Sequence, residues 1–335
     1  MEERIAISKF QRSDAGQVVY LWNQCADQKD IIYAPISENQ FFDIFLKTCH
    51  ETEEYMLIAR DVSGHIVGFA AGLTKCSYLQ GENAFNTPGY ITMVLVSPDS
   101  RRNGIGMRLL NELESRFAAG GKNRAAVTYR NPMALTWDIP DTPGVQHNNA
   151  PGVRMDSPAF QMFLKNGFRI AAVEHGMYLS LRNFTVGKRV KEKQDRLAKE
   201  GIRIQMYDPE AHYGFEALFD ALHGEVWRET IRENNKREKP LPVLIAEYEG
   251  RIVGFAGPID KERNGRGWFN GIGVHPEFEH RGIATVLFCR LMEQFAGIGA
   301  EYSSLFTDEE NPARKLYESV GFVTGCRFAV MEKEI

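Results

Sequence analysis

MVLVSPDSRRNGIG, residues 93–106, is the stretch that decides the fold of this chain. Its first four residues form an apolar run typical of a buried strand, and the next four predict a turn. From Ile105 onward, apolar residues recur at positions 109, 110, 113 and 117, which is the spacing of one helix face. Gly104 and Gly106 therefore lie where a strand passes into the N-terminus of a helix.

Such a corner is suited to bind phosphate. The first N–H groups of a helix have no intrahelical partner, and the positive end of the helix dipole faces outward. Two glycines let the backbone approach an anion, and Arg101 and Arg102 add charged donors. The structural alternative is a strand–turn–helix corner in which the glycines serve only close packing.

A second copy of this stretch occurs in the other half of the chain. Residues VHPEFEHRGIA align with VSPDSRRNGIG without a gap, and the segment IVGFA occurs twice, identically. Three blocks in one order, twice, indicate a duplicated domain. The paired blocks are 66–70 with 252–256, 96–106 with 274–284, and 157–168 with 311–322.

Together these blocks resemble the GCN5-related N-acetyltransferase (GNAT) superfamily. The resemblance is carried by the run V-x-P-x-x-R-x-x-G-x-G, the V-G-F-A segment before it and N-x-A-x-x-x-Y-x-x-x-G-F after it. It implies an α/β fold of two tandem GNAT-like domains, each a mixed twisted sheet flanked by helices. We expect the first domain at 1–182 with a long inserted loop at 131–156, a charged linker helix at 183–200, and the second domain at 201–335. The layout is similar to that of mycothiol synthases.

The resemblance also implies acyl-CoA, most simply acetyl-CoA, as co-substrate. Its pantetheine would lie against the strand before each glycine loop, and its pyrophosphate would lie on the loop. The residues implied for the pantetheine are Leu95, Val96, Gly273 and Val274. Those implied for the phosphates are Arg101, Arg102, Asn103, Gly104, Ile105 and Gly106 in the first copy and His280, Arg281, Gly282, Ile283 and Ala284 in the second, with Asn311 as a further cofactor contact.

The two copies differ at positions that matter for the chemistry. Glu279 stands where the first copy has Arg101, and a carboxylate beside a pyrophosphate is repulsive. Tyr317 stands where the family places the tyrosine that protonates the departing CoA thiolate, whereas the first copy has Phe163. We therefore hypothesise that the second domain is catalytic, with Tyr317 as general acid. The alternative is a core tyrosine on the inner face of a helix.

The general base is not identified by the sequence, because neither central strand carries a glutamate. The candidates in the second domain are Glu225, His275, Asp308 and Glu309.

Residues 137–152 have no counterpart in the second copy. Three prolines and two glycines forbid a helix there, and loops of this length are commonly lids or binding loops. Trp137, Asp138, Asp141 and His147 make the segment a candidate acceptor-binding loop, in which case the first domain would be the catalytic one. The alternative is an Ω-loop that covers the seam between the domains.

Composition narrows the classes of partner. The net charge of −4 gives no basic footprint, so we expect no nucleic-acid partner. The five cysteines are scattered without a C-x-x-C pair, and the eight histidines show no metal-ligand spacing, so the sequence predicts neither disulfides nor a metal site. No apolar run approaches the length of a membrane span, and the first residues lack the apolar core of a signal peptide. These features predict a cytoplasmic protein.

The sequence thus predicts an N-acyltransferase in which a small amine, or an exposed amino group of a protein, attacks the thioester of acyl-CoA directly. The alternative is a protein that binds acyl-CoA without turnover, as a sensor or structural partner.

Overall fold

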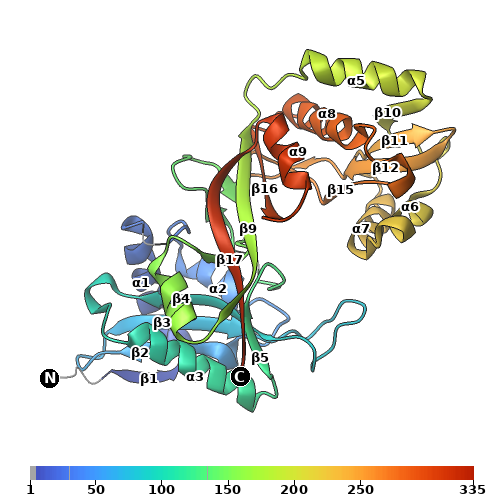
Figure 1. Cartoon of the computed structure of the whole chain (residues 1–335). Helices are drawn as coiled ribbons and strands as arrows, with labels where there is room; N and C mark the ends of the chain where they lie inside the picture. The colour runs from blue at the N-terminus through green and yellow to red at the C-terminus, as the bar shows by residue number, and fades with distance from the viewer. Residues whose placement is uncertain (1–4, 30, 134) are drawn as a thin grey trace. The chain divides into compact units, whose positions relative to one another are not determined.

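The computed structural model describes residues 5–29, 31–133 and 135–335. It divides the chain into two units (Figure 1). Unit 1 comprises Met1–Gly176 together with Gly325–Ile335, and unit 2 comprises Met177–Thr324. No helix of the described residues is long and apolar enough to cross a membrane.

Unit 1 is built on a mixed sheet in the order β1-β2-β3-β4-β5-β17. Neighbouring strands are antiparallel except for β4 and β5, which run parallel. The helices of unit 1 are α1 (Ala15–Asp27), α2 (Glu38–Phe45), α3 (Ile105–Ala119) and α4 (Pro158–Lys165). The strands up to the end of this half are β1 (Ala6–Lys9), β2 (Met56–Arg60), β3 (Ile66–Leu73), β4 (Gly89–Val96), β5 (Arg124–Val127), β6 (Trp137–Asp138), β7 (Gln146–His147), β8 (Val153–Arg154) and β9 (Arg169–Ser180).

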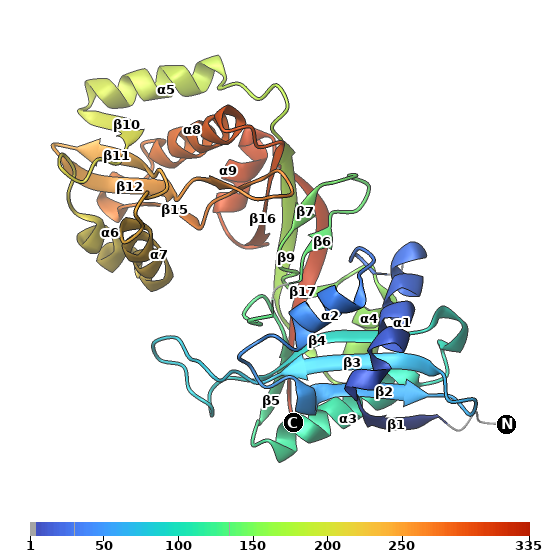
Figure 2. The same cartoon turned by 180° about the vertical axis from the view of Figure 1, so that it is seen from behind.

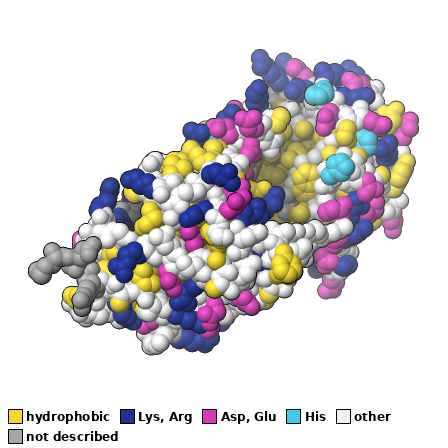
Figure 3. All heavy atoms as spheres, turned by 60° about the horizontal axis from the view of Figure 1, so that its bottom comes forward, with side chains coloured by type: hydrophobic (Ala, Val, Ile, Leu, Met, Phe, Trp, Pro, Cys, Tyr) yellow, Lys and Arg dark blue, Asp and Glu magenta, His cyan; other side chains and the backbone are white. Residues whose placement is uncertain are grey.

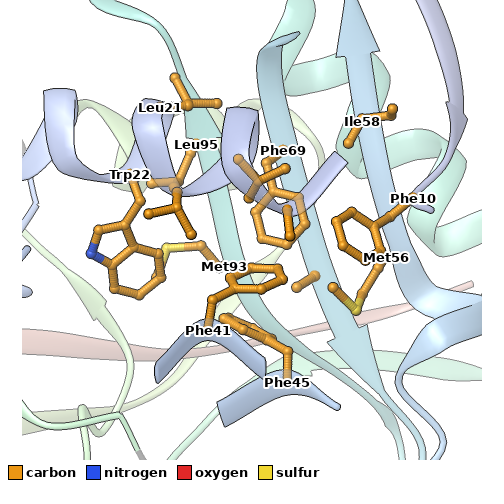
Figure 4. Close-up of a cluster of buried hydrophobic side chains, with 14 of the residues drawn as sticks. Phe10, Leu21, Trp22, Phe41, Phe45, Met56, Ile58, Phe69, Met93 and Leu95 are labelled. Carbon is orange, nitrogen blue, oxygen red and sulfur yellow. The ribbon is translucent and has the colours of Figure 1, made fainter. Parts of the chain in front are cut away.

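Helices cover both faces of this sheet. In Figure 2, α1 and α2 lie in front of β2 to β4, and α3 lies behind them. Along β3 the side chains alternate, so that Phe69 belongs to the cluster under α1 and α2 while Ala70 belongs to the cluster under α3. Figure 4 shows the first cluster, in which Phe41 and Phe45 of α2 pack against Phe69, and Trp22 of α1 packs against Phe45. The repeated IVGFA segment is therefore a strand buried on both faces.

Unit 2 repeats this plan with a four-stranded sheet in the order β10-β11-β12-β15. Helix α8 packs on one face of the sheet, and α6 and α7 pack on the other. The helices are α5 (Lys188–Lys199), α6 (Phe215–Leu222), α7 (Glu225–Asn235), α8 (Ile283–Gly297) and α9 (Ala313–Val320). The strands are β10 (Ile202–Met206), β11 (Leu244–Tyr248), β12 (Arg251–Gly257), β13 (Asp260–Lys261), β14 (Arg266–Trp268), β15 (Gly271–Val274), β16 (Tyr302–Asp308) and β17 (Val323–Glu334).

One packing detail is repeated in both units. A Cβ added to Gly89 of β4 would lie 2.3 Å from Cγ of Phe117 on α3. At the matching position of unit 2, a Cβ on Gly267 would lie 2.6 Å from Cγ of Phe295 on α8. In both units a phenylalanine ring rests directly on backbone, which only glycine permits. The duplication thus extends from sequence to side-chain packing, and the predicted α/β fold of two GNAT-like domains is confirmed.

The last strand of the chain, β17, follows the second domain in the sequence but pairs with strands of unit 1. Most of β17 belongs to unit 1, where Met331 pairs with Val127 of β5 and Ala329 pairs with Val153 of β8. Without β17, that edge of β5 would leave backbone N–H and C=O groups unpaired. Residues 325–335 therefore complete the first domain, where the sequence placed them in the second.

Helix α5 also differs from the expected linker. It belongs to unit 2, where Leu197 is fully buried in the core and Gln194 accepts a hydrogen bond from Nε of Arg290 on α8 (2.7 Å). The segment that was expected to join two domains is thus part of one of them, because Leu197 is buried in the core of unit 2 and Val190 packs against that core.

Candidate functional site

The glycine loop of unit 1 has the backbone of an anion-binding corner. β4 ends at Val96, and a short 3₁₀ turn, Pro98–Ser100, leads into the loop. Arg102 and Gly104 adopt left-handed conformations with φ of 65° and 73°, and Gly104 is the N-cap of α3. Left-handed residues beside a helix start arrange successive N–H groups into a concave site, to which the helix dipole adds positive potential.

This loop forms one wall of a cavity of about 790 Å³. The other walls come from the end of β4, from α4 with the residues just before it, and from Cys25 of α1 and Ile31. The cavity brings together seven positions singled out in the sequence, but Asn103 is exposed in the loop and is not a lining residue. The seven are Leu95, Val96, Arg101, Arg102, Gly104, Ile105 and Gly106.

Close approach of α4 to the loop depends on Gly106. A Cβ at this position would lie 2.9 Å from the sulfur of Met162, which also lines the cavity. The second glycine therefore serves packing between α3 and α4, and the first provides the left-handed turn.

The side chain of Arg101 lies at the end of β4. Its Nε donates a hydrogen bond to the carbonyl oxygen of Val96 (3.0 Å), and its Nη2 lies 3.7 Å from Sγ of Cys25. The Cys25 thiol also faces that carbonyl, at 3.8 Å. Cys25, on α1, is a lining residue that the sequence did not reveal, because its neighbours on β4 are far from it along the chain.

The corner in unit 2 has the same backbone. His280 and Gly282 are left-handed, with φ of 59° and 88°, and Gly282 is the N-cap of α8. A 3₁₀ turn, Pro276–Phe278, again precedes the loop. The strand before it is shorter, because β15 begins only at Gly271, and in it Gly273 and Val274 pair with β12.

The surroundings of the second corner are different. Arg196 of α5 donates a hydrogen bond from Nη2 to the carbonyl oxygen of Arg281 (2.9 Å). A Cβ at Gly282 would lie 3.5 Å from Cδ of Lys193. Two cations of α5 therefore stand at this loop, where Glu279 is exposed.

Tyr317 lies half-buried on α9, with its ring centroid 4.9 Å from that of Phe288 and 6.2 Å from that of Phe322. Burial raises the pKa of its hydroxyl above the ordinary value, so the group remains protonated. Its counterpart in unit 1, Phe163, is buried in the core. Asn311 uses its side-chain oxygen to accept from the N–H of Ala313 (2.9 Å) at the start of α9.

Two of the candidate bases are engaged in local contacts. Glu225 accepts a hydrogen bond from Nε of Arg228 (3.1 Å). Nε2 of His275 lies 3.1 Å from Nη2 of Arg251. Neither contact identifies a base.

The inserted segment forms a β-hairpin, β6–β7, in which Trp137 pairs with His147. Trp137 is fully buried, with its Nε1 donating to the carbonyl oxygen of Asn149 (2.9 Å) and its ring edge-to-face with Phe328. His147 is also buried, whereas Asp141 is exposed. None of these side chains lines the cavity, nor does Asp138, whose carboxylate accepts from Gln146 (2.7 Å). The aromatic residues that suggested a binding loop are part of the core.

Two corners of this kind, each with a left-handed turn before a helix start, thus occur in units of the same fold. Residues 18–135 and 206–322 match the acetyltransferase (GNAT) family. The chain therefore belongs to that family, with both halves matched, and the prediction of an N-acetyltransferase is confirmed.

Several known proteins are similar to this chain over most of its length. The mycothiol acetyltransferase of Thermobifida fusca (strain YX) is 27% identical over 258 residues, which cover 68% of this chain and 70% of that protein. A tandem GNAT protein from the clavulanic acid biosynthesis pathway superposes with a TM-score of 0.58 at 15% identity, covering 99% of this chain and 98% of its own. The GCN5-related glucosamine N-acetyltransferase region of a fungal multi-domain GH3 β-N-acetylglucosaminidase gives a TM-score of 0.70 at 17% identity. It covers 99% of this chain and 38% of that one. At these identities the solved structures show the fold alone.

Proposed function

We propose that the protein transfers an acyl group, most simply acetyl, from acyl-CoA to the nitrogen of a small amine or of an exposed amino group. The observation that carries this proposal is the cavity of unit 1, which joins a strand end, a left-handed glycine loop and a helix start. The family supplies the donor class, and the cavity supplies a place for it.

In this proposal the loop amides and Arg102 bind the diphosphate of CoA. The carbonyl of Val96 is engaged by Arg101, so we expect the Arg101 side chain to move from the strand end toward the phosphates when the donor binds. Backbone groups of Leu95 and Val96 then become available to the pantetheine. The corresponding groups in unit 2 are those of Gly273 and Val274, with the phosphates at 280–284 and Asn311 nearby.

For the chemical step we propose Tyr317 as the general acid. The neutral amine nitrogen forms a bond to the thioester carbon while the carbon–sulfur bond breaks. The nitrogen gives up one proton to water, and the sulfur needs a proton as it leaves. A half-buried phenol with a raised pKa is protonated at neutral pH and can supply it. Phe163 has no proton to give, so this role favours unit 2.

The acceptor belongs to the same proposal. The printed name of the Thermobifida relative, mycothiol acetyltransferase, favours a small molecule over a protein. Acidic residues slightly outnumber basic ones, which suits a cationic amine. On the face shown in Figure 3, Lys and Arg side chains are interspersed with Asp and Glu, which gives no continuous basic stripe of the kind that binds nucleic acid. Five cysteines without a C-x-x-C pair fit a reducing compartment such as the cytoplasm.

Release of CoA thiol from acetyl-CoA tests the proposal. We expect turnover with at least one member of a panel of polyamines, amino sugars, amino acids and peptide N-termini, and saturable binding of CoA in calorimetry. Binding of CoA without turnover across the panel would favour the binding-only alternative. Absence of any heat with CoA would contradict the assignment of the loops.

A further inference from the structure

A second cluster of chemically reactive side chains lies in unit 1 outside the cavity. Cys49 and His50 follow α2, and Cys76 follows β3. One ligand atom from each of the three lies within 4.8 Å of the others. Both cysteines are exposed and His50 is half-buried, so the cluster is accessible from solvent.

The backbone holds the two segments in register. Glu51 and Thr74 form an isolated antiparallel bridge, with N–H to carbonyl distances of 3.3 and 3.1 Å. The bridge places Cys49 and His50 on one side and Cys76 on the other. The cluster is therefore fixed by strand-like pairing rather than by chance contact of long side chains.

The geometry within the cluster is that of metal ligands. Sγ of Cys76 lies 3.6 Å from Nδ1 of His50. Two ligand atoms on a tetrahedral zinc ion, at bond lengths near 2.3 Å for sulfur and 2.0 Å for nitrogen, are about 3.5 Å apart. The N–H of Cys76 donates to Nδ1 (3.4 Å), so this nitrogen carries a lone pair, which a metal ion would take in place of that long hydrogen bond. Two thiolates and one imidazole form a ligand set that binds Zn²⁺ in preference to harder cations.

We propose that Cys49, His50 and Cys76 bind a thiophilic divalent cation, of which Zn²⁺ is the representative, with the fourth position left to water. The ion would join the segment after α2 to the end of β3 and so stabilise this edge of unit 1. At present the Cys76 thiol donates a hydrogen bond to the carbonyl oxygen of Cys49 (2.6 Å), and binding would replace its proton by the metal. The site is independent of acyl transfer.

Titration of the full-length, reduced protein with Co²⁺ tests the proposal. We expect one Co²⁺ per chain, with the thiolate-to-cobalt charge-transfer absorption of a tetrahedral sulfur site, and displacement by one equivalent of Zn²⁺. The Cys49→Ser and Cys76→Ser variants should lose this absorption, and His50→Gln should weaken binding. Cys289→Ala is the matched control, because it removes a buried thiol of α8 and should leave the spectrum unchanged.

Thermal unfolding gives a second readout. Zn²⁺ should raise the melting temperature of the wild type and of Cys289→Ala, but not of the two serine variants, because a ligand bound only to the folded state stabilises it. The proposal is overturned if the reduced wild type takes up no Co²⁺, or if the absorption persists in both serine variants. A Cys49–Cys76 disulfide in protein purified with Zn²⁺ would also overturn it.

Discussion

The corner at the start of α3 and the corner at the start of α8 share a backbone but not an environment. In both, a residue two positions before the N-cap glycine and the glycine itself are left-handed. In unit 1 the loop opens into a cavity and carries Arg101 at its first position. In unit 2 the same position is Glu279, and the cations at the loop come from α5.

This difference shows what duplication conserves. The left-handed turn and the helix start are requirements of the backbone, and both copies keep them. The charged side chains around a bound anion can come from any element that lies beside the loop. These side chains therefore differ between the two units. The proton donor has diverged too, since Tyr317 is matched by Phe163. We interpret the first corner as the tighter CoA-binding site and the second as the one at which the thioester reacts, because Tyr317 lies in unit 2.

The largest expected effect is that of Tyr317→Phe. Loss of a general acid should lower kcat by about 10-fold or more. The substitution removes one hydroxyl group only, so the KM for acetyl-CoA should remain nearly unchanged. Because burial raises the pKa of this phenol, the wild type should lose activity through this group only at a pH above the ordinary pKa of tyrosine. Steady-state kinetics against pH measures both.

Tyr213→Phe is the matched control, because Tyr213 is an exposed phenol of the same unit and its loss should leave kcat unchanged. Unchanged turnover in Tyr317→Phe would move the chemical step to unit 1 and reverse our interpretation of the two corners.

The next effect concerns stability rather than catalysis. Gly89→Ala and Gly267→Ala each force a methyl group against a buried ring, which costs about 1–3 kcal/mol of unfolding free energy. The cost should be larger at Gly89, since its Cβ would lie 2.3 Å from the ring of Phe117, against 2.6 Å at Gly267 from Phe295. Urea unfolding measures both.

A double-mutant cycle with Phe117→Leu distinguishes this cause from a general loss of strand propensity. If the clash is responsible, Gly89→Ala should cost less in the leucine background. Equal costs in both backgrounds would contradict the proposed packing.

A smaller effect is expected at the loop glycines. Gly104→Ala and Gly282→Ala introduce a side chain at φ of 73° and 88°, and a left-handed alanine costs roughly 1–2 kcal/mol. The space around Gly104 is open, so strain alone disturbs the amides. We expect CoA binding to weaken by about 10-fold in Gly104→Ala, measured by calorimetry, and by less in Gly282→Ala. The reverse order would show that unit 2 holds the tighter CoA-binding site.

The sequence predicted these corners because they are local. A strand, a turn, two glycines and a helix start all lie within 93–106, and their chemistry follows from residue type and spacing. The second copy confirmed the pattern independently. The sequence could not show which element lies beside each loop. Helix α5 and Gly282 are neighbours in the fold although they are far apart in the sequence.

Pairing between distant segments explains the other differences. Trp137 is buried by Phe328, and β17 pairs with β5 although it follows the whole second domain. Cys49 and Cys76 carry no recognisable spacing, yet one antiparallel bridge brings them together. Each of these features depends on contacts between residues far apart in the sequence, which a single sequence does not reveal.

The smallest predicted effect sharpens the comparison of the two loops. Glu279→Arg gives the second loop the residue type of the first and removes a carboxylate that faces the solvent. Exposed charges near an anion change binding by about 0.3–1 kcal/mol at low salt, so CoA affinity should rise by roughly 2- to 5-fold if the second corner binds the diphosphate. The gain should fall as ionic strength increases, because salt screens exposed charges.

Glu238→Arg, which makes the same change of charge at another exposed position of unit 2, is the matched control. A gain confined to Glu279→Arg would show that the second loop still binds phosphate. Equal affinities in all three proteins would mean that its amides no longer contact the donor, leaving unit 1 as the only glycine loop that binds CoA.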